Sequence, residues 1–416
     1  MTGVNRRQLL AGSAAAGAVG LGGVLAARDV AAAAPPVTTA TSAPFHGRHQ
    51  AGVLEQPQAN SAHVAFDLTI AGRHALAALM KTLTERARAL TAGGPSRPLG
   101  IAGPATDSGT MGPDQPASGL QVTVGLGATV FDGRFGLAGA KPARLRTMDT
   151  FVNDRLDRAE CDGDLLLTLS APDRDTVLHA LRDICRATRS SMQIRWRIDG
   201  FTPPARPTGA PRNQLGFKDG TANPDVTDPA EMDRLVWVRP GGDEPAWTGG
   251  GSYHVVRIIR MHVEFWDRVS VSEQERMFGR RKDTGAPLSG VHESDTPDYT
   301  DDPKGTAIPL DSHIRMANPR TPQTDQSRIL RRSYSYDRGV DEVGNLDVGL
   351  VFGAFQQDLD RQFVAVQKRL ADEPLVDYIT PTGGGYFFTL PGVRDTSTPT
   401  PAPCWRSTSP PKGSTA

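Results

Sequence analysis

A strand that leads through an acidic turn into an amphipathic helix occurs twice in this chain, and the repetition limits the choice of fold. LTLSAPDRDTVLHAL at 167–181 aligns with VFGAFQQDLDRQFVAV, which begins at 351, when Asp173 is matched to Asp358. Any strand–helix pair shares part of this pattern, so the match needs support from the elements around it. Two β-α-β units of this kind with antiparallel strands predict a duplicated ferredoxin-like α+β fold.

Hydrophobic periodicity supplies the other elements of each unit. Alternating apolar and polar residues predict strands, and leucines at helical spacing predict helices. In the first half the expected strands are 63–70, 120–126, 164–170 and 192–201, and the expected helices are 73–92 and 173–188. In the second half the expected strands are 234–238, 252–263, 329–336, 347–355 and 386–390, with one helix beginning near 273 and another at 359–370.

Segments rich in Gly, Pro, Ser and Thr divide the chain. TPPARPTGAPR at 202–212 separates the two halves, which predicts an N-terminal domain at 45–205 and a C-terminal domain at 206–392. A similar composition at 93–119 predicts a long surface loop, and residues 393–416 are expected to form a disordered tail.

The N-terminus has the pattern of an export signal. Arg6 and Arg7 precede a weakly apolar stretch, and small residues at 31–34 offer a cleavage site. This pattern indicates a twin-arginine signal peptide at 1–34 and a periplasmic or extracellular, cell-envelope location, with an ordinary signal peptide or a membrane anchor as alternatives. No other stretch approaches the roughly 18 apolar residues of a membrane-spanning helix, so we expect no stable membrane span in the mature protein.

Charge and cysteine content argue against several classes of protein. The 46 basic and 46 acidic side chains cancel, so we expect no nucleic-acid partner. Cys161, Cys185 and Cys404 form no C-x-x-C pair, which argues against a structural zinc or iron–sulfur site. A non-haem soluble enzyme such as a hydrolase is a further alternative, but the chain has no G-x-S-x-G motif.

One imidazole, one carboxylate and one guanidinium stand out. His313 lies in a Pro-bounded turn, Asp219 in a Gly-flanked turn, and Arg331 beside Arg332 in a run typical of a strand, where alternation allows only one of the two arginines to face a site. A neutral imidazole is the usual fifth ligand of haem iron. A carboxylate can move the proton of a bound peroxide, and a guanidinium can stabilise the charge on the leaving oxygen.

Each of these residues also has an ordinary structural role. Asp219 would commonly form an Asx turn, and paired arginines on a strand are commonly solvated. Other histidines compete with the candidate ligand: His46 and His49 have a spacing suited to a metal, and His254 and His262 share one face of a predicted strand.

Taken together, these segments resemble the dye-decolorizing peroxidases. The resemblance rests on GFKDGTANP at 216–224, SHIRMANPR at 312–320 and ILRRSYSYD at 329–337, and it is supported by GSYHVVRIIRMHVEFWDR at 251–268 and EQERMFGRRKDTGAPL at 273–288. The resemblance covers residues 45–392. It is strongest for the exported bacterial subgroup known as deferrochelatase/peroxidases, the haem components of iron-uptake systems.

The resemblance implies two ferredoxin-like domains, with one haem b per chain bound in the second. Carried over residue by residue, it makes His313 the proximal ligand of the haem iron, and Asp219 and Arg331 the catalytic acid and arginine on the opposite side. Gly216 and Gly220 would let the backbone approach the porphyrin closely.

Further assignments concern the surroundings of the haem. A proximal histidine normally donates its second N–H to a carboxylate, and Asp358 is the candidate, with a helix N-cap as its alternative role. Arg315 is the favoured partner of a haem propionate, ahead of Arg257, Arg280 and Arg281. Aromatic candidates for relaying electrons from bulky substrates are Trp237, Trp266, Tyr334 and Tyr336.

The function implied is a peroxidase that reduces hydrogen peroxide through a high-valent iron–oxo intermediate and oxidises organic, dye-like reductants. We expect best activity at acidic pH, because the distal base is Asp219 rather than a histidine. The alternative is a haem-binding deferrochelatase that releases iron. Expected partners are hydrogen peroxide, an organic reductant and iron-uptake components, and a homo-oligomer is left open.

Overall fold

The computed structural model describes residues 44–394, apart from 96–100, 104 and 116. The signal peptide predicted at 1–34 and residues 395–416 of the predicted tail lie outside this range. Val393, which was assigned to the tail, forms a β-bridge with His46. Within the described range, no helix combines the length and the apolar character that a bilayer crossing requires.

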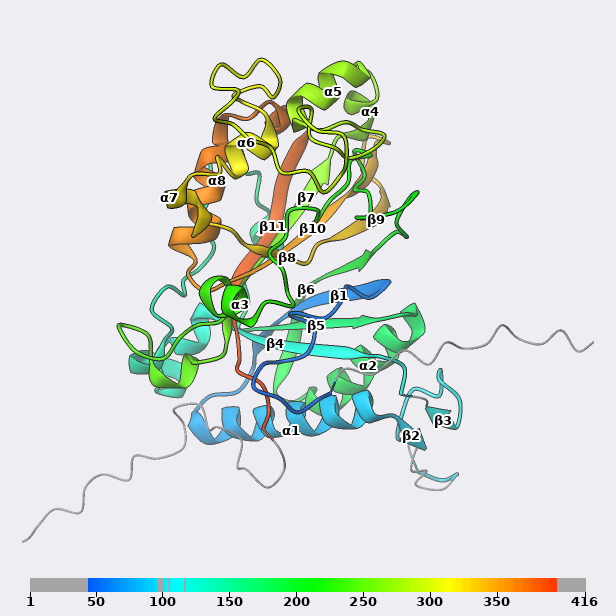
Figure 1. The fold of residues 1–416 in the computed structure, drawn as a ribbon. Helices are drawn as coiled ribbons and strands as arrows, with labels where there is room; N and C mark the ends of the chain where they lie inside the picture. Colours follow the sequence, from blue (N-terminus) through cyan, green and yellow to red (C-terminus); the bar gives the residue numbers. More distant parts are fainter. Residues whose placement is uncertain (1–43, 96–100, 104, 116, 395–416) are drawn as a thin grey trace, which may run out of the picture. The chain divides into compact units, whose positions relative to one another are not determined.

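The first half has the strand order of a ferredoxin-like unit (Figure 1). Its elements are β1 (Asn60–Leu68), α1 (Arg73–Ala92), β4 (Gln121–Gly127), β5 (Leu165–Ala171), α2 (Arg174–Thr188) and β6 (Met192–Phe201). The antiparallel strands lie in the order β4-β5-β1-β6. The two-residue strands β2 (Gly94–Pro95) and β3 (Asp114–Gln115) pair within the loop that follows α1.

Helices α1 and α2 pack against each other on one face of this sheet (Figure 1). The buried side chains of α1 recur at helical spacing and form one stripe: Leu76, Leu79, Met80, Leu83, Ala87 and Leu90. Helix α2 begins where Asp173 accepts a hydrogen bond from the Thr176 N–H at 2.7 Å, an N-cap that satisfies a free backbone donor.

The second half repeats the same order with β7 (Ser252–Met261), β9 (Tyr334–Val340), β10 (Leu346–Gln356) and β11 (Ile379–Thr389). Its antiparallel strands lie in the order β9-β10-β7-β11, so the predicted duplication of a ferredoxin-like α+β unit is confirmed. Between β10 and β11 the chain forms a π-helical turn (Asp360–Val364) and helix α8 (Ala365–Arg369).

The connection from β7 to β9 is long and contributes much of the candidate site. It contains α4 (Val263–Trp266), α5 (Val271–Phe278), α6 (His313–Ala317), α7 (Pro322–Asp325) and β8 (Leu330–Arg331). Strand β8 pairs with the same strand, β10, as β9 does, so the predicted strand 329–336 is interrupted at residues 332–333.

Two further pairings join the halves: β4 pairs with β11, and β6 pairs with β9. Because β10 also pairs with β7, the eight long strands form a closed ring of neighbours, β7-β11-β4-β5-β1-β6-β9-β10. The largest hydrophobic cluster includes Leu167 and Val122 from the first half and Phe363 and Tyr386 from the second. The two halves therefore share one core.

One predicted element is wrong. Residues 234–238 were expected to form a strand, but residues 234 and 235 end helix α3 (Pro229–Leu235) and residues 236–238 form no regular element. The side chain of Asp228 accepts hydrogen bonds from the N–H groups of Ala230 and Glu231, and Pro229 fills the first helical position. These start signals outweigh the short apolar run that suggested a strand. Helix α5 also begins earlier than expected, after an N-cap at Ser270.

Candidate active site

His313 is the first residue of α6, a short helix anchored at both ends. Before the helix, the hydroxyl of the N-cap residue Ser312 donates to the carbonyl of Pro309 at 2.8 Å. At its end, the guanidinium of Arg369 on α8 donates to the carbonyls of Met316 and Ala317 at 3.1 and 2.9 Å. These contacts fix the position of a helix too short to be stable by itself.

The imidazole of His313 is oriented by Glu373, which directly precedes the short 3-10 helix (Pro374–Asp377) that leads to β11. Its Nδ1 is 2.6 Å from Oε2 of Glu373, whose side chain is almost completely buried. Burial would lower the pKa of His313, but the charge and the hydrogen bond of Glu373 outweigh this effect and raise it. Because Nδ1 is engaged, Nε2 is the nitrogen left to act as a ligand, and no described residue is hydrogen-bonded to it.

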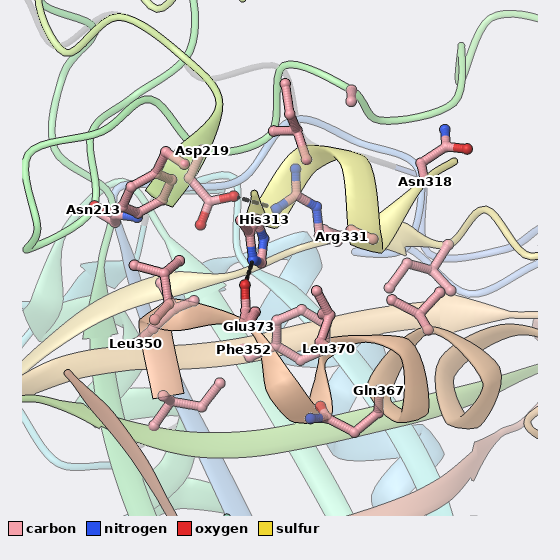
Figure 2. Close-up of a pocket in the computed structure, with 18 of the residues that line it drawn as sticks. Asn213, Asp219, His313, Asn318, Arg331, Leu350, Phe352, Gln367, Leu370 and Glu373 are labelled. Atoms are coloured by element: carbon pink, nitrogen blue, oxygen red, sulfur yellow. Dashed lines mark hydrogen bonds and ion pairs between the residues drawn. The ribbon is translucent and has the colours of Figure 1, made fainter. Parts of the chain in front are cut away.

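Asp219 and Arg331 form an ion pair on the same cavity (Figure 2). Oδ1 of Asp219 is 2.6 Å from Nη1 of Arg331, and both side chains are largely buried. Arg332 has the opposite orientation: it is buried away from the cavity, and this burial lowers its pKa. Of the two arginines only Arg331 lines the cavity, although both side chains are mostly buried.

The loop that carries Asp219 is held by the carboxylate of Glu293. This carboxylate pairs with Lys218 and accepts hydrogen bonds of 2.9 Å from the Ala210 N–H and the Thr221 hydroxyl. The Asp219 N–H in turn donates to the carbonyl of Pro211 at 2.9 Å. The carboxylate of Asp219 is thus presented by a rigid turn.

Gly216 and Gly220 are needed for the shape of this turn. Their φ angles are +86° and +102°, a conformation that residues other than glycine rarely adopt. Neither glycine lines the cavity. The backbone conformation of the turn accounts for both glycines, and the close approach to a porphyrin stays a prediction.

All three predicted groups, His313, Asp219 and Arg331, line one cavity of about 260 Å³. Its walls are mostly apolar and come from β7, β10, β11 and the segment around α8: Ile259, Met261, Leu350, Phe352, Phe363, Leu370, Leu375 and Ile379. Among the described residues, no group of three or more His, Cys, Asp or Glu side chains could hold a metal ion. A single free imidazole facing an apolar cavity suits a metal that a flat macrocycle already chelates.

Guanidinium groups in the cavity wall complete the fit to a cofactor with carboxylates. Arg257 on β7 is 1% exposed and pairs with Asp154, yet its Nε and Nη1 have no hydrogen-bond partner among the described residues. Arg257, Arg280 and Arg320 all line the cavity. Such donors in the wall of the cavity are suited to binding carboxylates.

Arg315, the favoured partner for a haem propionate, does not face the cavity. Its guanidinium donates to the carbonyls of Ile308 and Asp302 at 2.9 and 2.8 Å and lies over the ring of Tyr299. The prediction for Arg315 is wrong because the loop before α6 folds back and occupies its donors. Arg281 is exposed and also lies away from the cavity lining.

Asp358 is not the partner of His313. Its Oδ1 accepts hydrogen bonds from the N–H groups of Asp360 and Arg361 at 3.0 and 2.9 Å, at the start of the π-helical turn. Asp358 therefore has its alternative role, capping free N–H groups at the start of this helical segment. Glu373 takes the position beside the imidazole. No sequence pattern indicated it, because only the fold of the β10–β11 connection brings it to His313.

The remaining candidates have structural surroundings. The ring of His49 stacks on Trp237 at 3.6 Å, and its Nδ1 is 2.7 Å from the carbonyl of Gly250, so the H-x-x-H spacing forms no metal site there. His254 stacks on Phe355 within the sheet core. None of the four aromatic candidates for electron relay lines the cavity: Trp237, Trp266, Tyr334 and Tyr336.

Comparison with known proteins adds independent findings. Residues 50–202 match the family model for the N-terminal part of Dyp-type peroxidases, and residues 210–394 match the model for the C-terminal part. Proteins named deferrochelatase from Yersinia pestis and Escherichia coli O157:H7 are each 48% identical to this chain, over 401 and 400 residues. The alignments cover 94% of this chain in both cases, and 92% and 94% of the relatives.

Two solved structures have a fold similar to that of this chain. A DyP-type peroxidase from Cellulomonas bogoriensis superposes with a TM-score of 0.78 at 35% identity, covering 88% of this chain and 98% of that structure. Ferric DtpA from Streptomyces lividans superposes with a TM-score of 0.79 at 35% identity, covering 90% of this chain and 100% of that structure.

Proposed function

Because the chain belongs to the Dyp-type peroxidase family, we propose that its cavity binds one haem b through His313 and reduces hydrogen peroxide with the help of Asp219 and Arg331. The observation that carries this proposal is the convergence of a free imidazole nitrogen and an acid–guanidinium pair on one apolar cavity. An organic molecule would be the reductant.

Haem bound in this cavity would supply the redox chemistry, the transfer of oxidising equivalents from peroxide to the reductant. Nε2 of His313 would hold the iron, and Glu373 would orient the ring and increase its basicity. Arg257, with two donors that have no partner among the described residues, is the best candidate to hold a haem carboxylate, and Arg280 and Arg320 also line the cavity.

Asp219 and Arg331 would move protons and stabilise charge. The carboxylate of Asp219 takes a proton from one peroxide oxygen and returns it to the departing oxygen. The guanidinium of Arg331, already hydrogen-bonded to Asp219, stabilises the negative charge on that oxygen, an effect worth ~3–4 kcal/mol by analogy with oxyanion-hole donors.

The test is the rate at which haem-loaded protein reacts with peroxide, followed by stopped-flow absorbance of the Soret band. Asp219→Ala and Arg331→Ala should each slow this reaction by about 10²–10³-fold. Arg338→Ala removes an ion pair with Glu160 on the protein surface and should leave the rate unchanged. The proposed roles are refuted if neither substitution at the cavity slows the reaction.

Release of iron from haem is a second candidate function, favoured by the name deferrochelatase that the curated relatives carry. In that reaction iron would leave the porphyrin and two protons would take its place. Incubation of the haem-loaded protein with a reductant and a ferrous chelator should then yield iron-free porphyrin, identified by its fluorescence. Haem that remains intact while peroxide is still consumed would exclude this function.

We also propose export by the twin-arginine route, with iron-uptake components as partners in the cell envelope. Arg6 and Arg7 support the proposal, together with the similarity to deferrochelatases. Replacing both arginines by lysine should retain the protein in the cytoplasm, as measured by cell fractionation. Unchanged export would point to a different route.

A further inference from the structure

Arg331 is carried by a very short strand with one open edge. Strand β8 has only two residues, and in its pairing with β10 the residue opposite Arg331 is Ala354. The neighbouring Arg332 donates its N–H to the carbonyl of Gly353 at 2.7 Å. Hydrogen bonds alternate along an antiparallel pair, so the N–H and C=O of Arg331 itself point away from β10.

The carboxamide of Asn223 occupies this open edge. Its Nδ2 donates to the carbonyl of Arg331 at 2.9 Å, and its Oδ1 accepts from the Arg331 N–H at 3.0 Å. One side chain thus makes the pair of hydrogen bonds that a neighbouring strand would make. Without it, the main chain of Arg331 would have an unpaired donor and an unpaired acceptor at the edge.

Asn223 lies in the same loop as Asp219. That loop therefore contacts Arg331 twice: the carboxylate of Asp219 holds the guanidinium, and the carboxamide of Asn223 holds the main chain. Arg331 and Asp219 both line the cavity (Figure 2). Asn223 is not among the residues that line it. Asn223 can influence chemistry in the cavity only through the residues it holds.

We propose that Asn223 is a positioning residue for the reaction with peroxide. By clamping the main chain of Arg331, it aligns the guanidinium with Asp219 before peroxide arrives. This inference rests on the proposed function of the cavity and gives a role to Asn223, which lies in the GFKDGTANP segment but lines no part of the cavity. Small displacements of a charge-stabilising donor reduce its effect, because its contribution depends on preorganised geometry.

The chain provides a matched control in Gln50. Its carboxamide makes the same two hydrogen bonds to the main chain of Val124 on β4, at 2.8 and 2.9 Å, and a third to the carbonyl of Leu390. Both carboxamides are partly buried and both clamp a strand, but Gln50 is in the first half of the fold, outside the cavity lining. Gln50→Ala therefore measures the loss of such a clamp without any effect on the site.

The experiment compares Asn223→Ala with Gln50→Ala in haem-loaded protein. Two quantities are measured: the second-order rate constant for peroxide, and the affinity of the ferric haem for cyanide, an anion that the same guanidinium would stabilise. Asn223→Ala should lower the rate constant and the cyanide affinity by about tenfold each. A tenfold loss corresponds to the free energy of roughly one hydrogen bond that no longer aligns the guanidinium. Gln50→Ala should leave both unchanged, although both variants should lower the thermal unfolding midpoint.

Two further variants separate positioning from general damage. Asn223→Asp keeps the acceptor for the Arg331 N–H but cannot donate to its carbonyl, so its effect should lie between wild type and Asn223→Ala. In an Arg331→Ala background, Asn223→Ala should produce no additional loss, because its effect passes through Arg331. An equal loss in both backgrounds, or no loss in either, overturns the inference.

The outcomes distinguish this inference from the function on which it depends. If Asp219→Ala and Arg331→Ala slow the peroxide reaction but Asn223→Ala does not, only the positioning role fails. If none of the three slows the reaction, the proposed function of the cavity fails first.

Discussion

Two carboxylates at this site have different neighbours, and the neighbours decide what each can do. Glu373 is buried against the imidazole of His313, whereas Asp219 faces the cavity and contacts a guanidinium. A carboxylate bonded to Nδ1 stabilises a positively polarised ring and fixes its tautomer. A carboxylate open to the cavity is free to exchange a proton with a bound molecule.

Replacing Glu373 tests the first role. Glu373→Gln removes the charge that orients His313, so haem should be lost to apomyoglobin about 10–100-fold faster than from wild type. Asp358→Ala serves as the control, because the structure assigns that residue to capping the π-helical turn. Equal haem loss from both variants would show that Glu373 has no special part in holding the ligand.

At the scale of elements, a buried carboxylate attaches a loop to two strands. Asp164, just before β5, accepts hydrogen bonds from the Leu68 N–H, the Thr129 hydroxyl and the guanidinium of Arg134. Burial by itself would raise the pKa of Asp164, but these hydrogen bonds outweigh it and lower the pKa. The carboxylate therefore ties the loop after β4 to the adjoining ends of β1 and β5.

The lowered pKa sets the sign of a pH effect. A carboxyl group whose pKa is lower in the folded state stabilises the fold above its unfolded pKa, and this contribution is lost as the pH falls through the folded pKa. Asp164→Asn should lower the free energy of unfolding by about 2–3 kcal/mol at neutral pH. The difference from wild type should shrink below about pH 4, as measured by urea denaturation across pH.

An exposed pair supplies the comparison for this measurement. Asp243 pairs with Arg144 at 2.7 Å, but its side chain is 63% exposed. Asp243→Asn should therefore leave the free energy of unfolding unchanged within error. A pH-independent effect of Asp164→Asn would show that packing, rather than charge, determines its contribution.

The elements themselves were largely predictable from the sequence. The ranges expected for α1 and β6 agree with the structure, because each has a long and clear apolar period. The segment 234–238 was misread because a short apolar run does not distinguish a strand from the end of a capped helix. The interruption of the predicted strand 329–336 depends on how β8 and β9 meet β10, which no local pattern contains.

At the scale of the whole molecule, the two ferredoxin-like halves share their strands and their core. The ring of strand pairings and the common hydrophobic cluster leave neither half with a complete core of its own. Elements that share one core usually unfold together. The duplication is therefore visible in the topology, but we expect the two halves to unfold together in one cooperative transition.

A substitution in the core of the first half should therefore destabilise the haem cavity in the second. Leu167→Ala on β5 removes a fully buried side chain and should cost about 2–5 kcal/mol. Circular dichroism and Soret absorbance should shift together to lower denaturant in a single transition. Leu178→Ala, at a partly exposed position on α2, is the control and should shift neither signal appreciably. Two separate transitions would contradict the shared core.

The sequence by itself determined the fold class, the family resemblance and the three groups that meet at the cavity, because these depend on local periodicity and on short motifs. Only the tertiary structure decided their partners. Glu373 rather than Asp358 orients His313, Arg257 rather than Arg315 faces the cavity, and Asn223 clamps Arg331. The contacts of Glu373 and Asn223 join residues 60 and 108 positions apart. A hydrogen bond is decided by distance and direction in space, which spacing along the chain does not specify.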